Sequence, residues 1–139
     1  MDLFPEIDRK STRDNVDKLL RLYRNMARIA DEDYIPKVTA TYSFELKSFT
    51  GTTTNQIEKA VTRKVWAEKE LIKISKAMNR LNAYDRQMIY DKYMDPRELT
   101  NTAIWLNYHM SESTFYRELE CALVKFAEAY ENGSLLREF

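Results

Sequence analysis

The chain has 139 residues, 44% of them hydrophobic, with only two glycines and three prolines. That length allows one domain with a real core or two small helical units, and the scarcity of turn formers favours helices over tight β-hairpins. A single cysteine and a single histidine exclude an intramolecular disulfide and a Cys/His zinc site, so we expect no metal and no cofactor. The 22 basic and 22 acidic residues give a net charge of zero, and the fold class that we predict is all-α.

The first predicted helix begins at Ser11 or Thr12 and runs to about Ala30. Ser11, with Asp14 three residues on, resembles a capping box. The hydrophobic residues after this cap have the three-and-four spacing of one buried helix face. They are Val16, Leu19, Leu20, Tyr23, Met26, Ala27 and Ala30. Three acidic residues and then Pro36 end the helix.

Residues 35 to 54 consist largely of threonine and serine interleaved with aromatic residues. Alternation around residues 40 to 46 would suit a short strand, but one strand without a partner is not stable. We interpret this stretch as a linker. The first predicted unit, residues 1 to 54, is therefore the N-terminal helix and its linker.

The longest predicted helix spans residues 55 to 80, which is about 39 Å at 1.5 Å per residue. Hydrophobic residues at four-three spacing form a seam for packing against another helix, and a second apolar strip precedes the seam. The seam is Ala67, Leu71, Ile74, Met78 and Leu81, and the strip is Ile57, Val61 and Val65. We expect this helix to connect two helical units and to offer a surface for a homodimer.

Residues 81 to 139 form the third predicted unit, with three short helices. Each helix has a residue that can cap its N-terminus. These residues are Asn82, then Thr100 or Asn101, then Ser111. The first helix runs through Tyr93 and ends at Asp95-Pro96, because proline lacks a backbone donor and restricts the residue before it. The last ends near Asn132-Gly133, and its short connection to the preceding helix is typical of a helix-turn-helix.

The last helix has a hydrophobic face and a polar face. At 100° per residue, Leu119, Ala122 and Phe126 lie within about 40° of Phe115, which marks the buried direction. Arginine suits guanine, glutamate suits the amino group of cytosine, and hydroxyls suit bases or phosphates, so the first two turns of the outer face are candidates for the major groove. The alternative is an ordinary solvated face. The outer face carries Ser113, Arg117, Glu120 and Val124, of which Val124 is expected beyond the groove.

Charge is distributed unevenly along the chain. Residues 1 to 80 carry 16 basic and 12 acidic residues, whereas residues 81 to 139 carry 6 and 10. Since phosphate neutralisation supplies much of the affinity for DNA, the C-terminal half needs positive charge from elsewhere. The long helix offers a basic ridge opposite its seam, which is either a phosphate-contacting surface or a solvated face. The ridge is Lys69, Lys73, Lys76 and Arg80, and a weaker basic candidate is Arg21, Arg24 and Arg28.

Four residues that could suggest chemistry have a simpler interpretation. His109 is predicted to be a turn residue, and Cys121 is predicted to have no activating basic neighbour and to be inert. Trp66 and Trp105 are predicted to pack rather than to stack on bases. No glycine-rich phosphate loop occurs, so we expect no enzymatic activity.

Two known groups of regulators resemble this chain. Residues 81–93, residues 110–115 and Leu119 to Ala122 resemble the fourth region of bacterial sigma factors. Motifs along nearly the whole chain look like the ArpU family of phage transcriptional regulators. These motifs are Ile7-Asp8, Thr12, Tyr23-Arg24-Asn25-Met26, Thr39-Ala40-Thr41-Tyr42-Ser43 and Ala122-Leu123-Val124-Lys125-Phe126-Ala127-Glu128-Ala129-Tyr130.

The resemblance implies a regulator encoded by a phage or prophage of a Gram-positive bacterium, which activates late genes for packaging, morphogenesis and lysis. It implies that the last helix binds promoter DNA while another surface meets host RNA polymerase. The residues that it places toward the groove are Ser111, Glu112, Ser113, Thr114, Tyr116 and Arg117. Departures from the pattern are Trp105 in place of a small residue, His109 in place of the turn glycine, and Glu118 and Glu120 in place of basic residues.

A second hypothesis, from another functional class, is a helical interaction factor that docks on polymerase or another regulator with little DNA contact. The acidic C-terminal half favours it. A small DNA-packaging adaptor is a third. The N-terminal residues lack a basic region followed by an apolar run, so we expect the protein in the cytoplasm of the bacterial host cell, without a membrane partner.

Overall fold

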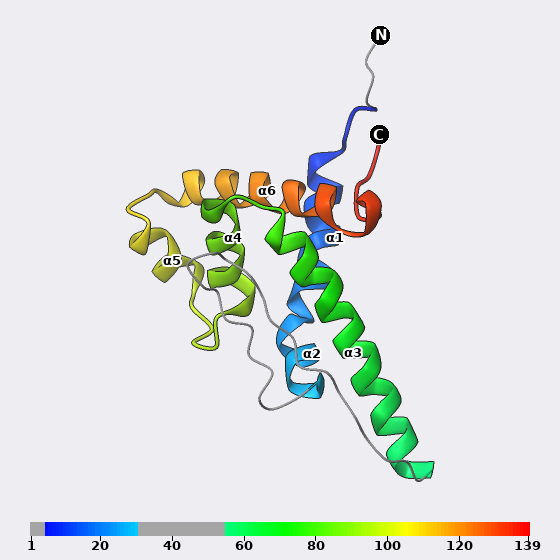
Figure 1. Ribbon diagram of the computed structural model, residues 1–139. Coiled ribbons are helices and arrows are strands. Elements are labelled where there is room, and N and C mark those ends of the chain that lie inside the picture. The colour runs from blue at the N-terminus through cyan, green and yellow to red at the C-terminus, as the bar shows by residue number, and fades with distance from the viewer. Residues whose placement is uncertain (1–4, 31–54) are drawn as a thin grey trace.

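The computed structural model describes residues 5–30 and 55–139, and the predicted linker lies outside this range. Within it, helices and helical turns make up nearly all of the regular structure, which confirms the all-α prediction (Figure 1). The one other regular feature among the described residues is an isolated bridge between Ile7 and Glu138. The elements are α1 (Arg9–Arg21), α2 (Tyr23–Ala30), α3 (Asn55–Asn79), α4 (Ala83–Ile89), the π-helical turn η1 (Tyr90–Met94), α5 (Asn101–Asn107), α6 (Glu112–Ala129) and the 3-10 turn η2 (Glu131–Gly133).

The predicted first helix is two helices, and its start was predicted wrongly. Asp8 caps α1 instead of Ser11: its carboxylate accepts hydrogen bonds from the Ser11 amide at 3.2 Å and the Ser11 hydroxyl at 2.7 Å. The chain then kinks at Leu22, whose amide donates to the Leu19 carbonyl at 3.1 Å, a tighter turn than an α-helix has. After the kink, α2 packs against α3.

The seam predicted on the long helix is confirmed as a buried surface. Its five residues are buried, and α3 packs against both α2 and α6. The surface predicted for a homodimer is therefore occupied within the chain. The first half of α3 extends beyond the body of the molecule (Figure 1).

The helix that begins after Asn82 ends in a wider turn than predicted. Asn82 caps α4 by accepting from the Asp85 amide at 2.9 Å, as expected. At η1 the Asp95 amide donates to the Tyr90 carbonyl, five residues back, at 2.9 Å. Asp95 is extended, and Pro96 comes directly after it at the predicted end.

Arg86 is a buried cation that the sequence did not single out. Its guanidinium donates to the carbonyls of Met78 at 2.8 Å and Asn79 at 3.5 Å, and also to that of Leu81. These carbonyls lie at the C-terminal end of α3, where a helix has unpaired acceptors and negative partial charge. Arg86 thus fixes α4 on the end of α3.

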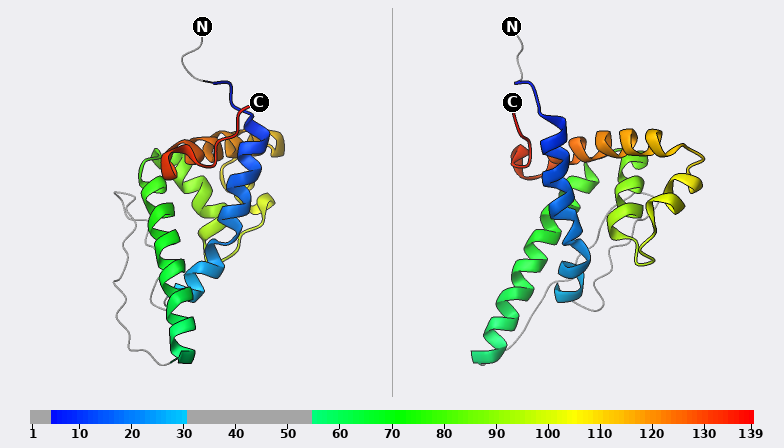
Figure 2. Two further views of the ribbon diagram at one scale, coloured as in Figure 1. Left: turned by 90° about the vertical axis from the view of Figure 1, so that its right-hand side faces the viewer. Right: turned by 180° about the vertical axis from the view of Figure 1, so that it is seen from behind.

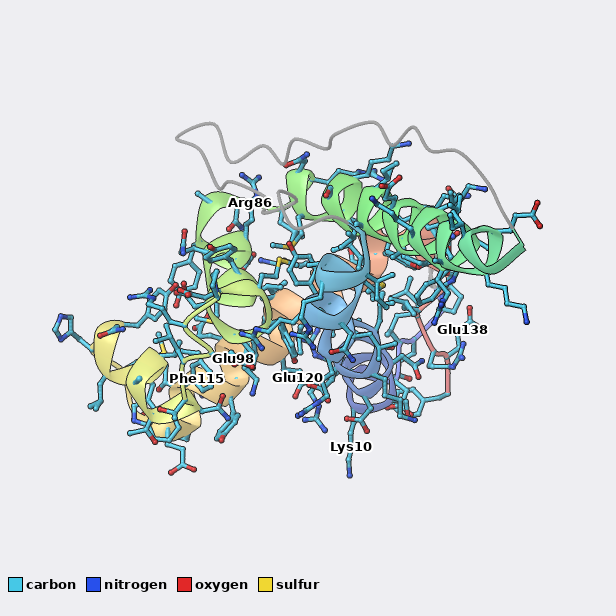
Figure 3. The ribbon with its side chains drawn as sticks, turned by 90° about the horizontal axis from the view of Figure 1, so that it is seen from below. Lys10, Arg86, Glu98, Phe115, Glu120 and Glu138 are labelled. Carbon is cyan, nitrogen blue, oxygen red and sulfur yellow. The ribbon has the colours of Figure 1, made fainter. Side chains whose placement is uncertain are left out.

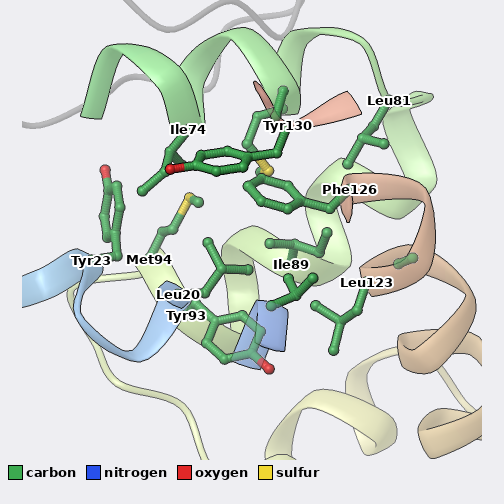
Figure 4. Packing of buried hydrophobic residues seen from close by; sticks show 14 of the residues in the cluster. Leu20, Tyr23, Ile74, Leu81, Ile89, Tyr93, Met94, Leu123, Phe126 and Tyr130 are labelled. Carbon is green, nitrogen blue, oxygen red and sulfur yellow. The ribbon is translucent and has the colours of Figure 1, made fainter. Parts of the chain in front are cut away.

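One hydrophobic core joins all three predicted units. The core draws Leu20 from α1, Ile74 from α3, Ile89 from α4 and Phe126 from α6 (Figure 4). Tyr130 lies just after α6 and donates a hydrogen bond to Glu70 of α3 at 3.0 Å. The C-terminal helices are therefore built into the N-terminal ones rather than held away from them.

The last helix ends earlier than predicted. α6 stops at Ala129, and the chain turns back through η2. Asn132 (φ 57°) and Gly133 (φ 80°) both have left-handed backbones, which agrees with a chain reversal at this pair. Beyond it, the Asp8 amide donates to the Arg137 carbonyl at 2.8 Å, so the described ends of the chain lie together (Figure 2).

Candidate nucleic-acid interface

α5 and α6 are joined by a tight turn, and both predicted caps are confirmed. Thr100 caps α5 by accepting from the Ala103 amide at 3.1 Å, and Ser111 caps α6 by accepting from the Thr114 amide at 3.2 Å. Between the helices, the Met110 amide donates to the Trp105 carbonyl at 3.0 Å. Local capping groups therefore define where α6 begins and how it leaves the turn.

His109 is the turn residue that the sequence predicted. Its φ is 54°, in the left-handed region that favours glycine, and its side chain is exposed. The structure gives it a backbone role.

The buried face of α6 is the predicted one. Phe115, Leu119, Ala122 and Phe126 are all buried. The ring of Phe115 lies 5.8 Å from that of Trp105 on α5, so Trp105 packs between the helices as expected. Trp66 is 49% exposed on α3, so the prediction that it packs is wrong.

The first two turns of α6 carry most of the candidate reading residues. Five of the six groove-facing candidates are exposed, and Thr114 is partly buried. Thr114 accepts hydrogen bonds from the Ser111 hydroxyl at 2.9 Å and from Arg117 at 3.5 Å. Tyr116 accepts one from Asn101 of α5 at 3.3 Å. The exposed five are Ser111, Glu112, Ser113, Tyr116 and Arg117.

Beyond these turns, α1 covers the face of α6 that was expected to be open. Glu120 forms ion pairs with Arg9 at 3.3 Å and Arg13 at 3.5 Å, both from α1. Val124, one turn further on the same face, is buried. Figure 3 places Glu120 beside α1 and apart from Phe115. Glu120 therefore binds α1, and Val124, which was predicted on the outer face beyond the groove, is buried instead.

Cys121 has a basic neighbour, contrary to the prediction. Arg9 donates to its Sγ at 3.3 Å. Arg9 is 112 residues away in the sequence and reaches the thiol only because α1 crosses α6. The contact could not be predicted from the sequence, because the two residues are so far apart along the chain.

The predicted basic ridge on α3 lies at the far end of α6. Lys69, Lys76 and Arg80 are exposed, but Lys73 forms ion pairs with Glu70 at 3.1 Å and Glu131 at 2.8 Å. Hydrogen bonds to Glu131 and then Glu70 raise the pKa of Lys73.

A surface hollow lined by Lys73, Lys76 and Arg80 also includes Ala129 and Asn132. Ala129 is about 24 Å from Ser113 along the helix axis, at 1.5 Å per residue. The structure therefore does not bring the ridge and the reading residues together.

The weaker basic candidate on the first helix is also engaged within the chain. Arg21 pairs with Asp17 at 2.7 Å, and Arg24 donates to the Asp95 carbonyl at 3.0 Å. Arg28 donates to Asn25. These three arginines do not form one open stripe.

A groove that sequence reasoning missed lies beside Tyr116. It has a volume of about 350 Å³ and is enclosed by α1, η1, α5 and α6. Lys92 of η1 donates to the side chain of Asn101 at 2.8 Å on one wall. Burial and, secondly, the nearby Arg21 lower the pKa of Lys92. No sequence signal marks this groove, because α1 reaches η1 only through the tertiary fold.

Among residues 5–30 and 55–139, no group of three or more histidine, cysteine, aspartate or glutamate side chains could hold a metal ion. In the same part of the chain, no helix combines the length and apolar character needed to cross a bilayer.

Comparison with known proteins gives relatives over almost the full length. The chain is 31% identical over 137 residues to a proposed autolysin regulatory protein, ArpU, of Streptococcus phage O1205, covering 98% of this chain and 99% of the relative. It is 29% identical over 140 residues to the protein of the same name in Enterococcus hirae, covering 98% of each. No family model and no solved structure matches. The alignment with the phage relative covers almost the whole of both chains at 31% identity, and this chain therefore belongs to the ArpU family.

Proposed function

We propose that this protein is a DNA-binding transcription activator of phage or prophage late genes, in which α5 and α6 act as a sigma region-four-like helix-turn-helix. The observation that carries the proposal is the restricted exposure of α6. Between Ser113 and Val124, its outer face is open only over the first two turns, which are the turns that enter the major groove in helix-turn-helix proteins. The relatives, named as autolysin regulatory proteins, support a regulatory role in the context of lysis.

In this proposal the residues of the first two turns have different roles, which follow from their functional groups. Arg117 and Ser113 read base edges, since a guanidinium suits guanine and a hydroxyl suits several bases. Glu112 suits the amino group of cytosine. Thr114 and Ser111 hold the helix start in position, because their hydroxyls already bond to each other. Glu120 is left out, because α1 neutralises it.

Host RNA polymerase is the proposed protein partner, and the bacterial cytoplasm is the proposed site of action. The acidic balance of residues 81 to 139 leaves the reading end short of positive charge. A promoter complex with polymerase would supply affinity that this half lacks. The ridge from Lys69 to Arg80 remains a candidate phosphate surface, and a homodimer through α3 would need a face other than its buried seam.

The test is selection of bound sequences from a random duplex pool, followed by Arg117→Ala. We expect the wild-type protein to enrich one motif, and the variant to lose about 1–3 kcal/mol of binding at one base position while other positions keep their preference. Arg63→Ala, an exposed arginine on the first half of α3, is the charge-matched control and should leave the motif unchanged. An unchanged motif with Arg117→Ala would remove the assignment of α6 as the reading helix.

A second candidate function is a protein-interaction factor that docks on polymerase and touches DNA little. The acidic half supports it. Capture of polymerase by the tagged protein after nuclease treatment, together with no enriched motif from the duplex pool, would favour this candidate over the first.

A further inference from the structure

The groove beside Tyr116 is lined by three basic side chains and three carboxylates, and one of the basic side chains forms no ion pair with a described residue. Its three carboxylates each have an arginine partner from α1. Asp17 pairs with Arg21 at 2.7 Å, Asp14 with Arg13 at 3.2 Å, and Glu120 with Arg13 and also with Arg9 at the edge of the groove.

Lys92 is the cation that remains. In the described part of the chain it forms no ion pair, and its only hydrogen bond is to the neutral side chain of Asn101. An ammonium has three donors, so two are not used by Asn101, and the nitrogen also lies 5.7 Å from the centroid of the Tyr93 ring. The charged group is half-buried, and a partly desolvated cation binds an anion more strongly than a fully hydrated one.

Asn101 connects Lys92 to the recognition helix. Its Oδ1 accepts from Lys92 Nζ at 2.8 Å, and its Nδ2 donates to the Tyr116 hydroxyl at 3.3 Å. The tyrosine oxygen is thereby an acceptor, and its own proton is free to be donated outward. The three side chains, from η1, α5 and α6, form a chain of donors along one wall of the groove.

The position of the groove relative to the reading residues can be derived from the helix geometry. At 100° per residue, Tyr116 lies on the flank of α6 between the buried direction of Phe115 and the outer face of Ser113 and Arg117. A duplex whose major groove holds that outer face presents its sugar-phosphate backbone to the flanks of the helix. Figure 2, right, shows this side, with α1 in front and α6 above.

We propose that the groove receives one backbone phosphate of the duplex, with Lys92, Asn101 and Tyr116 as its hydrogen-bond donors, an inference that rests on the proposed function. Lys92 then supplies the positive charge that the acidic C-terminal half otherwise lacks. The contact is independent of base sequence, because the groove meets the backbone only.

The test measures binding of fluorescent duplexes over a range of salt concentrations, with the motif enriched by the wild-type protein and with a random-sequence duplex. Lys92→Met should weaken binding to both duplexes about tenfold near 0.1 M salt and reduce the slope of log affinity against log salt by about 0.9, with the sequence preference unchanged. Lys92→Arg should keep the slope. Tyr116→Phe should weaken binding several-fold without changing the slope.

Lys59→Met, an exposed lysine near the start of α3, is the matched control for loss of one positive charge and should leave the slope unchanged. Thermal unfolding of each variant verifies that it is folded. If Lys92→Met is not folded, the binding affinity of Tyr116→Phe is the test instead. An unchanged slope with Lys92→Met, while Arg117→Ala alters the motif, overturns the phosphate site and leaves the proposed function standing. A slope that falls only with Lys76→Met assigns the contact to the ridge and overturns it also. If the wild-type protein binds neither duplex, both proposals fail together.

Discussion

His109 holds the turn before the recognition helix in a backbone conformation that costs free energy. A non-glycine residue with φ of 54° is strained because its Cβ approaches the backbone. The turn is kept in place by the hydrogen bond between Met110 and Trp105 and by the Ser111 cap. The strain is therefore local and can be removed by a single substitution.

We expect His109→Gly to stabilise the protein by about 0.5–1 kcal/mol, since glycine adopts this φ without strain. Urea unfolding followed by circular dichroism measures the change. His109→Ala keeps a Cβ and serves as the control, with no gain expected. Equal stabilities of the glycine and alanine variants would contradict the strain.

Hydrogen bonds between near neighbours are the part of the site that could be predicted from the sequence. The caps at Asn82, Thr100 and Ser111 each join a side chain to an amide three residues on. Such contacts depend only on local spacing. The pairs Arg9–Glu120 and Lys92–Asn101 could not be predicted, because they exist only after α1, η1, α5 and α6 have packed together.

At the scale of elements, α1 decides how much of α6 is available. A helical wheel treats the outer face of α6 as continuous from Ser113 to Val124. In the structure α1 packs along α6, pairs with Glu120 and, between Ser113 and Val124, leaves only the first two turns open. The wheel identifies the faces of one helix but not which neighbour covers them, which is why Val124 was misassigned.

Val124→Ser should destabilise the fold by about 1–3 kcal/mol, because it removes apolar contact and places a hydroxyl in a buried position. Arg117→Ala, on the same face but exposed, should change stability by less than about 0.5 kcal/mol. Urea denaturation of the two variants gives the comparison. A neutral Val124→Ser would mean that α1 does not cover this face.

At the scale of the molecule, the shared core predicts that the chain unfolds as one unit. Trp66 on α3 and Trp105 on α5 report on the central and C-terminal parts. We expect the single-tryptophan variants Trp66→Phe and Trp105→Phe to give unfolding curves by fluorescence that coincide with circular dichroism of the same variant. Separate midpoints would instead support the division into residues 55–80 and 81–139 as independent units.

Acid should destabilise the fold, because hydrogen bonds in the folded state lower the pKa of two of its aspartates. Burial disfavours the charged form of Asp17, but hydrogen bonds from Arg21 and Tyr93 outweigh it and lower its pKa. Hydrogen bonds from Arg97 lower the pKa of Asp95, despite its burial. A lowered folded-state pKa contributes stability above the unfolded value of about 3.9, and this contribution is lost as the pH falls through the folded value.

We therefore expect the free energy of unfolding to fall as the pH drops below about 4, and to fall less steeply in Asp17→Asn, which has already lost its charge. Urea unfolding at a series of pH values measures both slopes. Asp14→Asn, an exposed aspartate on the same helix, is the control. Identical slopes for Asp17→Asn and the wild-type protein would count against the tie between α1 and η1.

In the π-helical turn η1, the number of residues matters as much as their identity. Within the turn, Tyr93 points into the core and donates to Asp17 at 2.7 Å, while Lys92 lines the groove. A π-helical turn holds one residue more than an α-helical turn, so removing one residue between Tyr90 and Met94 would allow an ordinary α-helical turn to form. The deletion would move Lys92 and Tyr93 relative to the groove and the core without altering either side chain. We therefore expect evolution of this family to accept substitutions in the turn more readily than insertions or deletions.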